Sequence, residues 1–245
     1  MNVALLGATK GMGRALARLM AGRGDRIFLL GHVPEETERS AGDLEIRGAQ
    51  RPVKTALCDL LRPETFCNAL DRAEEELGGL DAVVVTAGLF GTQEQLEEDP
   101  DWAGRVLLAN YANTVLFCEE ARKRLLAGGG GTLCVFSSVA GDRGRKPVIL
   151  YGSAKAGLSH YLEGLDHKFR AAGLTTICVK PGFVKTGMTA GLKPPPFAGE
   201  PAGVARRVLK AIDRGSPMIY VPWQWRWVMC IIRCLPRFVM RKINF

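Results

Sequence analysis

The chain alternates between short apolar runs and longer stretches in which apolar residues recur at helical spacing. The apolar runs predict strands at residues 3–6, 26–30, 81–86, 132–137 and 175–179. The helical stretches lie at about 12–23, 102–126 and 151–171. Continuously apolar strands separated by helices are typical of a parallel sheet that is buried on both faces. Right-handed crossovers then predict a single α/β domain with a Rossmann-like, doubly wound sheet.

Two segments depart from this alternation. Residues 185–201 are rich in proline and glycine. Residues 222–245 form a tail that holds three of the four tryptophans and is basic, with no acidic residue. Pro236 is expected to divide this tail into two helical pieces. We therefore expect a body over residues 1–221 and a separate basic and aromatic tail over 222–245.

Composition narrows the class of protein. A chain of 245 residues with 47% hydrophobic residues suits one domain with a full core. The net charge of +8 is compatible with nucleic acid, an anionic membrane or a phosphate-bearing ligand. Seven cysteines without a C-x-x-C pair, and three histidines away from ligand spacing, favour reduced thiols and no metal site. No signal-peptide pattern and no run of about 20 apolar residues is present, which predicts a cytoplasmic protein.

A glycine-rich turn follows the first predicted strand. Its sequence is Gly7-Ala8-Thr9-Lys10-Gly11-Met12-Gly13, and a helical pattern begins at once. Glycines let the backbone turn tightly and approach a pyrophosphate, and a helix N-terminus offers free N–H groups to an anion. Between a strand and a helix, this pattern favours a dinucleotide site over an ordinary turn.

A second group of residues carries acid–base chemistry. Tyr151 and Lys155 are four residues apart at the start of a predicted helix, and therefore lie on one face. A neighbouring ammonium is expected to lower the pKa of the phenol and to suit it to proton transfer. Ser138 lies thirteen residues before Tyr151 at the end of a strand, where its hydroxyl can hydrogen-bond a substrate oxygen. Ser137 is the competing serine.

The G-x-x-x-G-x-G turn, the Ser138/Tyr151/Lys155 spacing and the Lys180-Pro181-Gly182-Phe183-Val184-Lys185-Thr186 stretch together resemble the short-chain dehydrogenase/reductase family over residues 1–220. The resemblance implies an oxidoreductase that moves a hydride between nicotinamide and a carbonyl or hydroxyl carbon. It also implies four catalytic residues, namely Asn110, Ser138, Tyr151 and Lys155. Thr86 stands where the family usually has asparagine. The direction of reaction stays open, and the expected cofactor favours reduction.

The same resemblance implies a set of cofactor-binding residues. They are Gly7, Thr9, Lys10, Gly11, Met12, Gly13, Arg14, His32, Asp59, Leu60, Ala87, Gly88, Asn110, Tyr151, Lys155, Pro181, Gly182, Val184 and Thr186. No carboxylate directly follows the second predicted strand, where an NAD-preferring site has one. Lys10, Arg14 and His32 are available to a 2′-phosphate instead. We therefore expect NADP(H) to be favoured over NAD(H).

The substrate and the partners follow from the two unusual segments. By resemblance, residues 185–201 form a lid, to which Met188, Leu192 and Phe197 give apolar character. Tryptophan and arginine in the tail suit a membrane interface. A tail that closes the site, or packs at a subunit contact, is an equally weighted alternative. A nucleic-acid partner is not expected, because no recognition motif accompanies the charge.

The segments around Ser138 and Tyr151, together with the tail, resemble decaprenylphosphoryl-2-keto-pentofuranose reductases, and the stretch from Lys180 also resembles ketosphinganine reductases. Both resemblances imply a hydrophobic or lipid-linked carbonyl substrate, such as a 2-keto sugar on polyprenyl phosphate, with membrane association. A 3-ketoacyl-type reductase, a soluble reductase of small carbonyls and a non-enzymatic nucleotide sensor are the alternatives. Family resemblance implies a homodimer or homotetramer.

Overall fold

The structure is a computed structural model, and it describes residues 1–243. Within that range one sheet is formed by seven parallel strands in the order β3-β2-β1-β4-β5-β6-β7. The strands are β1 (Asn2–Leu6), β2 (Arg26–Gly31), β3 (Thr55–Leu57), β4 (Ala82–Val85), β5 (Gly131–Phe136), β6 (Leu174–Pro181) and β7 (Met218–Val221). The predicted fold class, a Rossmann-like doubly wound sheet, is confirmed.

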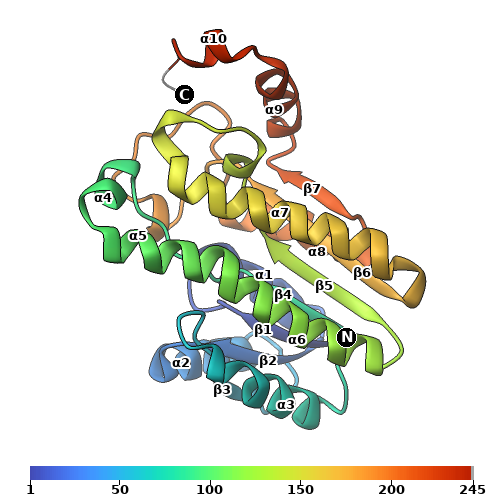
Figure 1. Ribbon diagram of the computed structural model, residues 1–245. Coiled ribbons are helices and arrows are strands. Elements are labelled where there is room, and N and C mark those ends of the chain that lie inside the picture. Colours follow the sequence, from blue (N-terminus) through green and yellow to red (C-terminus); the bar gives the residue numbers. More distant parts are fainter. Residues whose placement is uncertain (244–245) are drawn as a thin grey trace.

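Helices cover both faces of the sheet (Figure 1). The near face in Figure 1 carries α3 (Phe66–Leu77), α6 (Asn113–Ala127) and α7 (Ile149–Phe169). The opposite face carries α1 (Gly11–Gly22), α2 (Pro34–Ile46) and α8 (Pro201–Arg214). The shorter helices are α4 (Gln93–Glu98), α5 (Pro100–Leu107), α9 (Trp225–Cys234) and α10 (Arg237–Met240).

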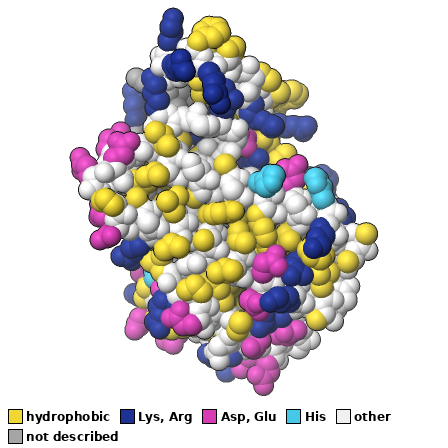
Figure 2. Space-filling model, viewed as in Figure 1, with side chains coloured by type: hydrophobic (Ala, Val, Ile, Leu, Met, Phe, Trp, Pro, Cys, Tyr) yellow, Lys and Arg dark blue, Asp and Glu magenta, His cyan; other side chains and the backbone are white. Residues whose placement is uncertain are grey.

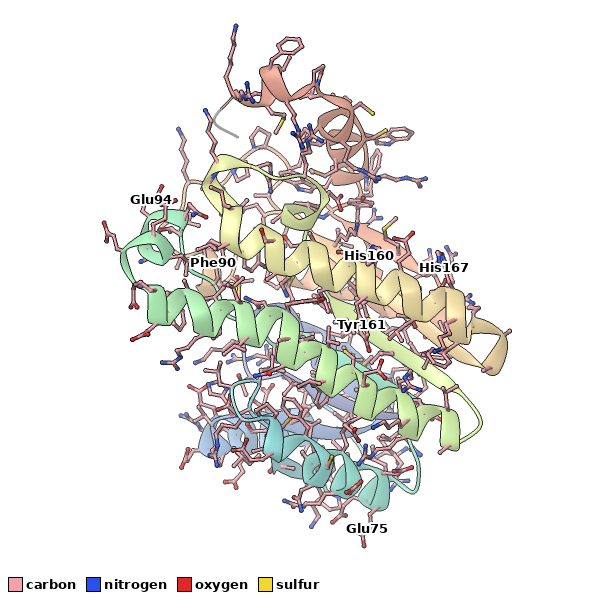
Figure 3. All side chains as sticks on the ribbon, in the orientation of Figure 1. Glu75, Phe90, Glu94, His160, Tyr161 and His167 are labelled. Carbon is pink, nitrogen blue, oxygen red and sulfur yellow. The ribbon has the colours of Figure 1, made fainter. Side chains whose placement is uncertain are left out.

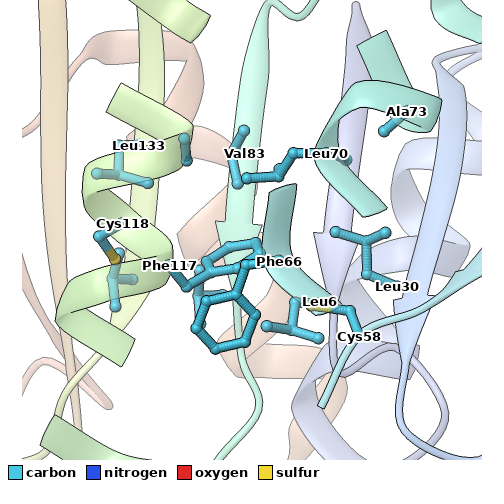
Figure 4. Close-up of a cluster of buried hydrophobic side chains, with 14 of the residues drawn as sticks. Leu6, Leu30, Cys58, Phe66, Leu70, Ala73, Val83, Phe117, Cys118 and Leu133 are labelled. Carbon is cyan, nitrogen blue, oxygen red and sulfur yellow. The ribbon is translucent and has the colours of Figure 1, made fainter. Parts of the chain in front are cut away.

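Alternation along each strand divides the core into two layers. In β1, Ala4 and Leu6 join the cluster beneath α3, α6 and α7, whereas Val3 and Leu5 join the cluster beneath α1, α2 and α8. Successive strand residues point to opposite faces, so a sheet covered on both sides must be apolar at every position. Figure 4 shows the first cluster, where the rings of Phe66 and Phe117 meet edge to face at 5.4 Å.

The strands β3 and β7 and the helices α2, α3 and α8 were not predicted. β3 is only three residues long, and the four-residue apolar run of β7, Met218–Val221, was overlooked. The helical stretch predicted over 102–126 is confirmed, and it consists of three consecutive helical pieces. A π-helical turn over Leu108–Ala112 separates α5 from α6, and it contains Asn110.

The tail packs against the body as two short helices. Trp225, Met229 and Ile232 of α9 are buried together with Val139 at the end of β5. Pro236 separates α9 from α10, as predicted. No helix within residues 1–243 has the length and apolar character needed to cross a membrane.

The expectation of buried thiols holds for four of the seven cysteines. Cys58, Cys118, Cys134 and Cys178 are buried and free. Cys67 and the two tail cysteines are also free but exposed. The tail cysteines were misjudged because they lie in an apolar run, and the run belongs to a surface helix of which only one face is covered.

Candidate active site

The glycine-rich turn joins β1 to α1, and its glycines let neighbouring segments approach its backbone closely. Gly7 and Gly11 have φ values of +98° and +54°, a region that side chains strongly disfavour. A Cβ on Gly13 would overlap the carbonyl oxygen of Gly7 and the hydroxyl of Thr86. That hydroxyl donates to the carbonyl oxygen of Gly7 at 2.9 Å, so Thr86 holds the turn at the position where asparagine was expected.

A cavity of about 380 Å³ opens beside this turn at the carboxyl ends of β1, β2 and β4. Strand order reverses between β1 and β4, and open α/β sheets bind ligands at such a point. Twelve of the predicted cofactor residues line the cavity: Gly7, Thr9, Lys10, Gly11, Met12, Gly13, His32, Asp59, Leu60, Ala87, Gly88 and Thr186. The cavity is also lined by Val33, Glu36, Cys58, Leu89 and Arg105, which were not predicted although most of them neighbour predicted positions along the chain. Met188, predicted for the lid, lines it as well.

A second cavity of about 410 Å³ adjoins the first and shares Thr9, Lys10 and Glu36 with it. It is lined further by Arg14, Arg18, Arg39, Ser40 and Asp43. The Nζ atom of Lys10 lies 2.8 Å from a carboxylate oxygen of Glu36, and this hydrogen bond lowers the pKa of Glu36. Predicted residue Arg14 belongs to this second cavity, where its Nε donates to the carbonyl oxygen of Thr9 at 2.7 Å.

The two candidate serines after β5 have different surroundings. Ser137 is buried, and its Oγ is engaged with the carbonyl oxygen of Lys155 at 2.9 Å and with Ser159 Oγ at 2.7 Å. Ser138 is partly exposed and opens the 3-10 turn Val139–Asp142, where its Oγ accepts from the N–H of Ala140 at 3.1 Å. Its hydroxyl donates only a long hydrogen bond, of 3.5 Å, to the carbonyl oxygen of Pro181, which a substrate oxygen can replace.

Tyr151 and Lys155 lie on the first turns of α7, with the Lys155 Nζ 5.9 Å from the centre of the tyrosine ring. The ring of Phe90 packs edge to face on Tyr151 at 5.2 Å, and Figure 3 labels Phe90 beside the start of α7. The Oε1 of Gln93 accepts from the N–H groups of Ile149 at 2.8 Å and of Leu150 at 3.2 Å. This cap from α4 fixes the end of the helix that carries Tyr151.

The expected lowering of the tyrosine pKa is not found in this structure. Burial raises the pKa of Tyr151 to about 12, against a smaller opposing effect of a hydrogen bond with Ser138. Burial lowers the pKa of Lys155 to about 8. The ammonium donates to the carbonyl oxygen of Phe136 at 2.9 Å instead of to the phenol, so desolvation outweighs its attraction for the phenolate.

Asn110 projects from the π-helical turn and pairs with the backbone after β4. Its Nδ2 donates to the carbonyl oxygen of Leu89 at 2.6 Å, and its Oδ1 accepts from the N–H of the same residue at 3.1 Å. A Cβ on Gly88 would lie 2.6 Å from the Oδ1 of Asn110 and 3.7 Å from the Nζ of Lys155. The structure thus brings Asn110 and Lys155 together at the Gly88 wall of the cavity.

The other seven predicted cofactor residues do not line the first cavity, namely Arg14, Asn110, Tyr151, Lys155, Pro181, Gly182 and Val184. The indole of Trp225 from the tail covers Gly182 so closely that a Cβ there would overlap it. The base of the predicted lid is closed by backbone pairing of Phe183 and Lys185 with Gly199. Thr186 does line the cavity, and its Cγ2 would lie 3.3 Å from a Cβ on Gly11.

Comparisons with known proteins agree with this geometry. The family model described as short chain dehydrogenase matches residues 1–196. An uncharacterized oxidoreductase of Streptomyces coelicolor is 34% identical over 252 residues, which cover 99% of this chain and 95% of that protein. The chain belongs to the short-chain dehydrogenase/reductase family.

Two further matches extend the comparison. Carbonyl reductase family member 4 of Danio rerio is 29% identical, over 88% of this chain and 91% of that protein. The structure of a short-chain type dehydrogenase/reductase from Mycobacterium ulcerans superposes with a TM-score of 0.79 at 20% identity, covering 89% of this chain and 86% of that one. That structure supports the fold alone.

The short-chain dehydrogenase/reductase described here is therefore an NAD(P)-dependent oxidoreductase that acts on a small molecule. The residues present fit the nicotinamide cofactor, because three glycines leave the turn without Cβ atoms where a pyrophosphate would approach the start of α1. Gly7, Gly11 and Gly13 form that cradle. Asp59 is oriented beside the cavity by accepting from the N–H of Leu61 at 2.9 Å.

Proposed function

We propose that this enzyme is an NADP(H)-dependent reductase that converts a ketone on a hydrophobic or lipid-linked substrate to an alcohol. The observation that carries the proposal is the convergence of Ser138, Tyr151 and Lys155, with Lys155 next to Gly88 of the glycine-lined cavity. Ser137 is excluded by its own hydrogen bonds. The carbonyl reductase relative supports reduction of a carbonyl carbon.

When bound beside the glycine-rich turn, the nicotinamide cofactor would supply a hydride to the carbonyl carbon. Ser138 donates a hydrogen bond to the substrate carbonyl oxygen and stabilises the negative charge that develops there. Tyr151 transfers its phenolic proton to that oxygen, which completes the alcohol. Lys155 keeps a positive charge next to the resulting phenolate and lowers its energy. Asn110 positions the loop that follows β4 by bonding to the backbone of Leu89.

Preference for NADP(H) is supported by the second cavity. Four cations and two carboxylates line it, namely Lys10, Arg14, Arg18, Arg39, Glu36 and Asp43. A 2′-phosphate here competes with Glu36 for the ammonium of Lys10, since the two are already paired at 2.8 Å. Titration with NADPH and NADH should show tighter NADPH binding in the wild type. Lys10→Ala should remove most of that preference, whereas Glu36→Gln should increase it.

A lipid-linked substrate and contact with an anionic membrane are supported by the lid and the tail. Met188, Leu192 and Phe197 on the lid are all exposed. The tail exposes Trp223, Trp227, Ile231 and Phe238, and Figure 2 shows Lys and Arg side chains gathered over the same end of the molecule. Exposed aromatic and basic residues together suit a lipid headgroup layer. The opposite face of α9 packs on the body, where Trp225 covers Gly182, which supports the alternative in which the tail helps to close the site.

Turnover of ketones by the full chain tests the chemistry. Short and long-chain ketones are offered with NADPH, and nicotinamide fluorescence is followed. We expect long-chain ketones to be reduced faster and Tyr151→Phe to abolish turnover while NADPH still binds. Binding of neither nucleotide would refute the reductase assignment and favour a protein or membrane role for the tail.

We also propose that the enzyme forms a homodimer or homotetramer. The π-helical turn and α6 expose Leu108, Tyr111 and Leu116, which are between 43% and 51% exposed. Apolar side chains gather over this region in Figure 2. Light scattering on the purified chain measures the mass, and Leu116→Glu should reduce it to that of one chain.

A further inference from the structure

The hydroxyl of Ser138 is directed by two stretches of backbone that belong to different elements. Its Oγ accepts from the N–H of Ala140, in the 3-10 turn Val139–Asp142, at 3.1 Å. It donates to the carbonyl oxygen of Pro181, at the end of β6, over the long distance of 3.5 Å. The distance between this turn and β6 therefore determines where the hydroxyl points.

One carboxylate joins the same two stretches. Asp142 is the last residue of the turn, and its Oδ1 lies 2.6 Å from the Nζ of Lys180, which directly precedes Pro181. Its Oδ2 accepts from the hydroxyl of Tyr220 at 2.8 Å. Tyr220 lies on β7 and is the register partner of Lys180. The two oxygens of one carboxylate are thus bound by two neighbouring strands.

The other contacts of the turn are steric or apolar. A Cβ on Gly141 would lie 2.6 Å from the carbonyl carbon of Lys155, so the turn rests directly on the backbone of α7. Val139 is buried together with Trp225 and Met229 of α9. Apolar packing has no preferred direction, whereas hydrogen bonds to both oxygens of a carboxylate fix its orientation as well as its distance.

The burial of the ion pair indicates a role other than stability. The side chains of Asp142 and Lys180 are 2% and 11% exposed. The desolvation of two charges offsets most of their attraction, and an apolar pair of similar volume is often at least as stable. The geometry that the pair imposes on the turn is therefore its more important contribution.

We propose that Asp142 is a positioning residue for the catalytic serine. Through Lys180 and Tyr220 it holds the turn so that the Ser138 hydroxyl faces the substrate oxygen. The inference rests on the proposed function, because it deepens the role of Ser138 in that site. Asp142 acts through Ser138 and not on the substrate, and its effect on the rate must therefore depend on the serine hydroxyl.

Reduction of 2-decanone with NADPH tests this dependence, in the steady state for kcat and KM and in single turnovers for slow variants. We expect Asp142→Asn to lower kcat by about 10- to 100-fold and to change KM less than about twofold, because the lost contact is made in the transition state. Together with Ser138→Ala, the same substitution should change the rate less than about twofold. An equal loss with and without Ser138→Ala would overturn the proposal.

Two comparisons separate positioning from stability. Asp166→Asn removes the carboxylate of a more exposed pair with Arg170 and should leave kcat within about twofold. Asp142→Asn/Lys180→Met should regain part of the stability in guanidinium unfolding, because the uncompensated ammonium is gone, yet kcat should stay as low as in Asp142→Asn. Recovery of kcat along with stability would show that the pair is merely structural.

A milder variant keeps the test decisive if Asp142→Asn does not fold. Tyr220→Phe removes one hydrogen bond from the carboxylate and leaves the ion pair in place. We expect it to lower kcat by about two- to fivefold, and to do so only when Ser138 is present. The same loss in the Ser138→Ala background would contradict an action through the serine. Circular dichroism shows whether each variant is folded.

Amide hydrogen exchange measures the turn without any substrate. The N–H of Ala140 bonds to Ser138 Oγ, and the N–H of Leu89 bonds to Asn110 Oδ1, both at 3.1 Å, so Leu89 is an internal reference. Asp142→Asn should speed the exchange of Ala140 by at least about tenfold and that of Leu89 by less than about twofold. Equal effects on the two amides would refute the positioning role. Acceleration confined to Ala140 in a protein that reduces no ketone would refute the reductase function and support the coupling of Asp142 to the Ser138 turn.

Discussion

A buried ion pair joins the turn that follows Ser138 to β6. Its removal should lower the free energy of unfolding by an amount that can be predicted from its burial. Asp142 ends the turn that Ser138 opens, and its carboxylate lies 2.6 Å from the Lys180 ammonium, with side-chain exposures of 2% and 11%. In Asp142→Asn the ammonium stays buried without a counter-charge. Removing one partner of a buried pair costs about 3–5 kcal/mol. The amide can still bond to Tyr220 and Lys180, so we expect about 3 kcal/mol.

Guanidinium unfolding followed by circular dichroism measures this loss. For a domain of this size the same change lowers the melting temperature by about 6–12 °C. Asp166→Asn is the matched control, because it removes the carboxylate of a more exposed pair with Arg170 at 3.1 Å and should cost less than about 1 kcal/mol. Adding Lys180→Met to Asp142→Asn should restore part of the stability. A loss below about 1 kcal/mol in Asp142→Asn would refute the reasoning that this pair is desolvated.

Three other variants test the site. Gly13→Ala should abolish NADPH binding because its Cβ would overlap the Gly7 carbonyl, whereas Gly22→Ala, with open space around it, should leave titrations unchanged. Burial lowers the pKa of Lys155 to about 8 from 10.5, so the unfolded state binds more protons between these values. Denaturation across this window should therefore show the wild type gaining stability with rising pH relative to Lys155→Met. Trp225→Ala should cost about 3–5 kcal/mol and expose the lid to proteolysis, because its indole is buried and donates to the Phe197 carbonyl at 3.3 Å. A variant as stable and protease-resistant as Trp227→Ala, which alters an exposed side chain, would contradict that role.

The fold class could be predicted because strands that are buried on both faces appear in the sequence as continuous apolar runs. A central strand such as β4, Ala82–Val85, must be apolar at every position, and the sequence shows this directly. The edge strand β3 has no such pattern, since it is three residues long and partly exposed, whereas β7, Met218–Val221, is apolar throughout and could have been predicted. The helical spacing over 102–126 did not reveal the π-helical turn at Asn110, because one extra residue per turn changes the spacing very little.

Most of the predicted cofactor residues that line the first cavity could also be identified from the sequence. Gly7 and Gly13 occupy positions that admit no Cβ, partly because Thr86 packs against them, and the glycine spacing between a strand and a helix indicates such a turn in the sequence. The pairing of Lys10 with Glu36 was not predicted, because it joins α1 to α2 across a contact that spacing does not encode. The same holds for the tail: its composition predicted a surface segment, but not that Trp225 packs over Gly182.

By itself, then, the sequence determined the class of sheet, the glycine turn and the order of Ser138, Tyr151 and Lys155. Each of these features is indicated by a pattern of residues that are close together in the sequence, such as an apolar run or a fixed spacing. The tertiary structure alone decided which serine is buried and fully hydrogen-bonded, where the Lys155 ammonium points, and that Trp225 covers Gly182. Each of these depends on desolvation and on contacts between distant segments, and the strength of a charge or a hydrogen bond is set by what surrounds it.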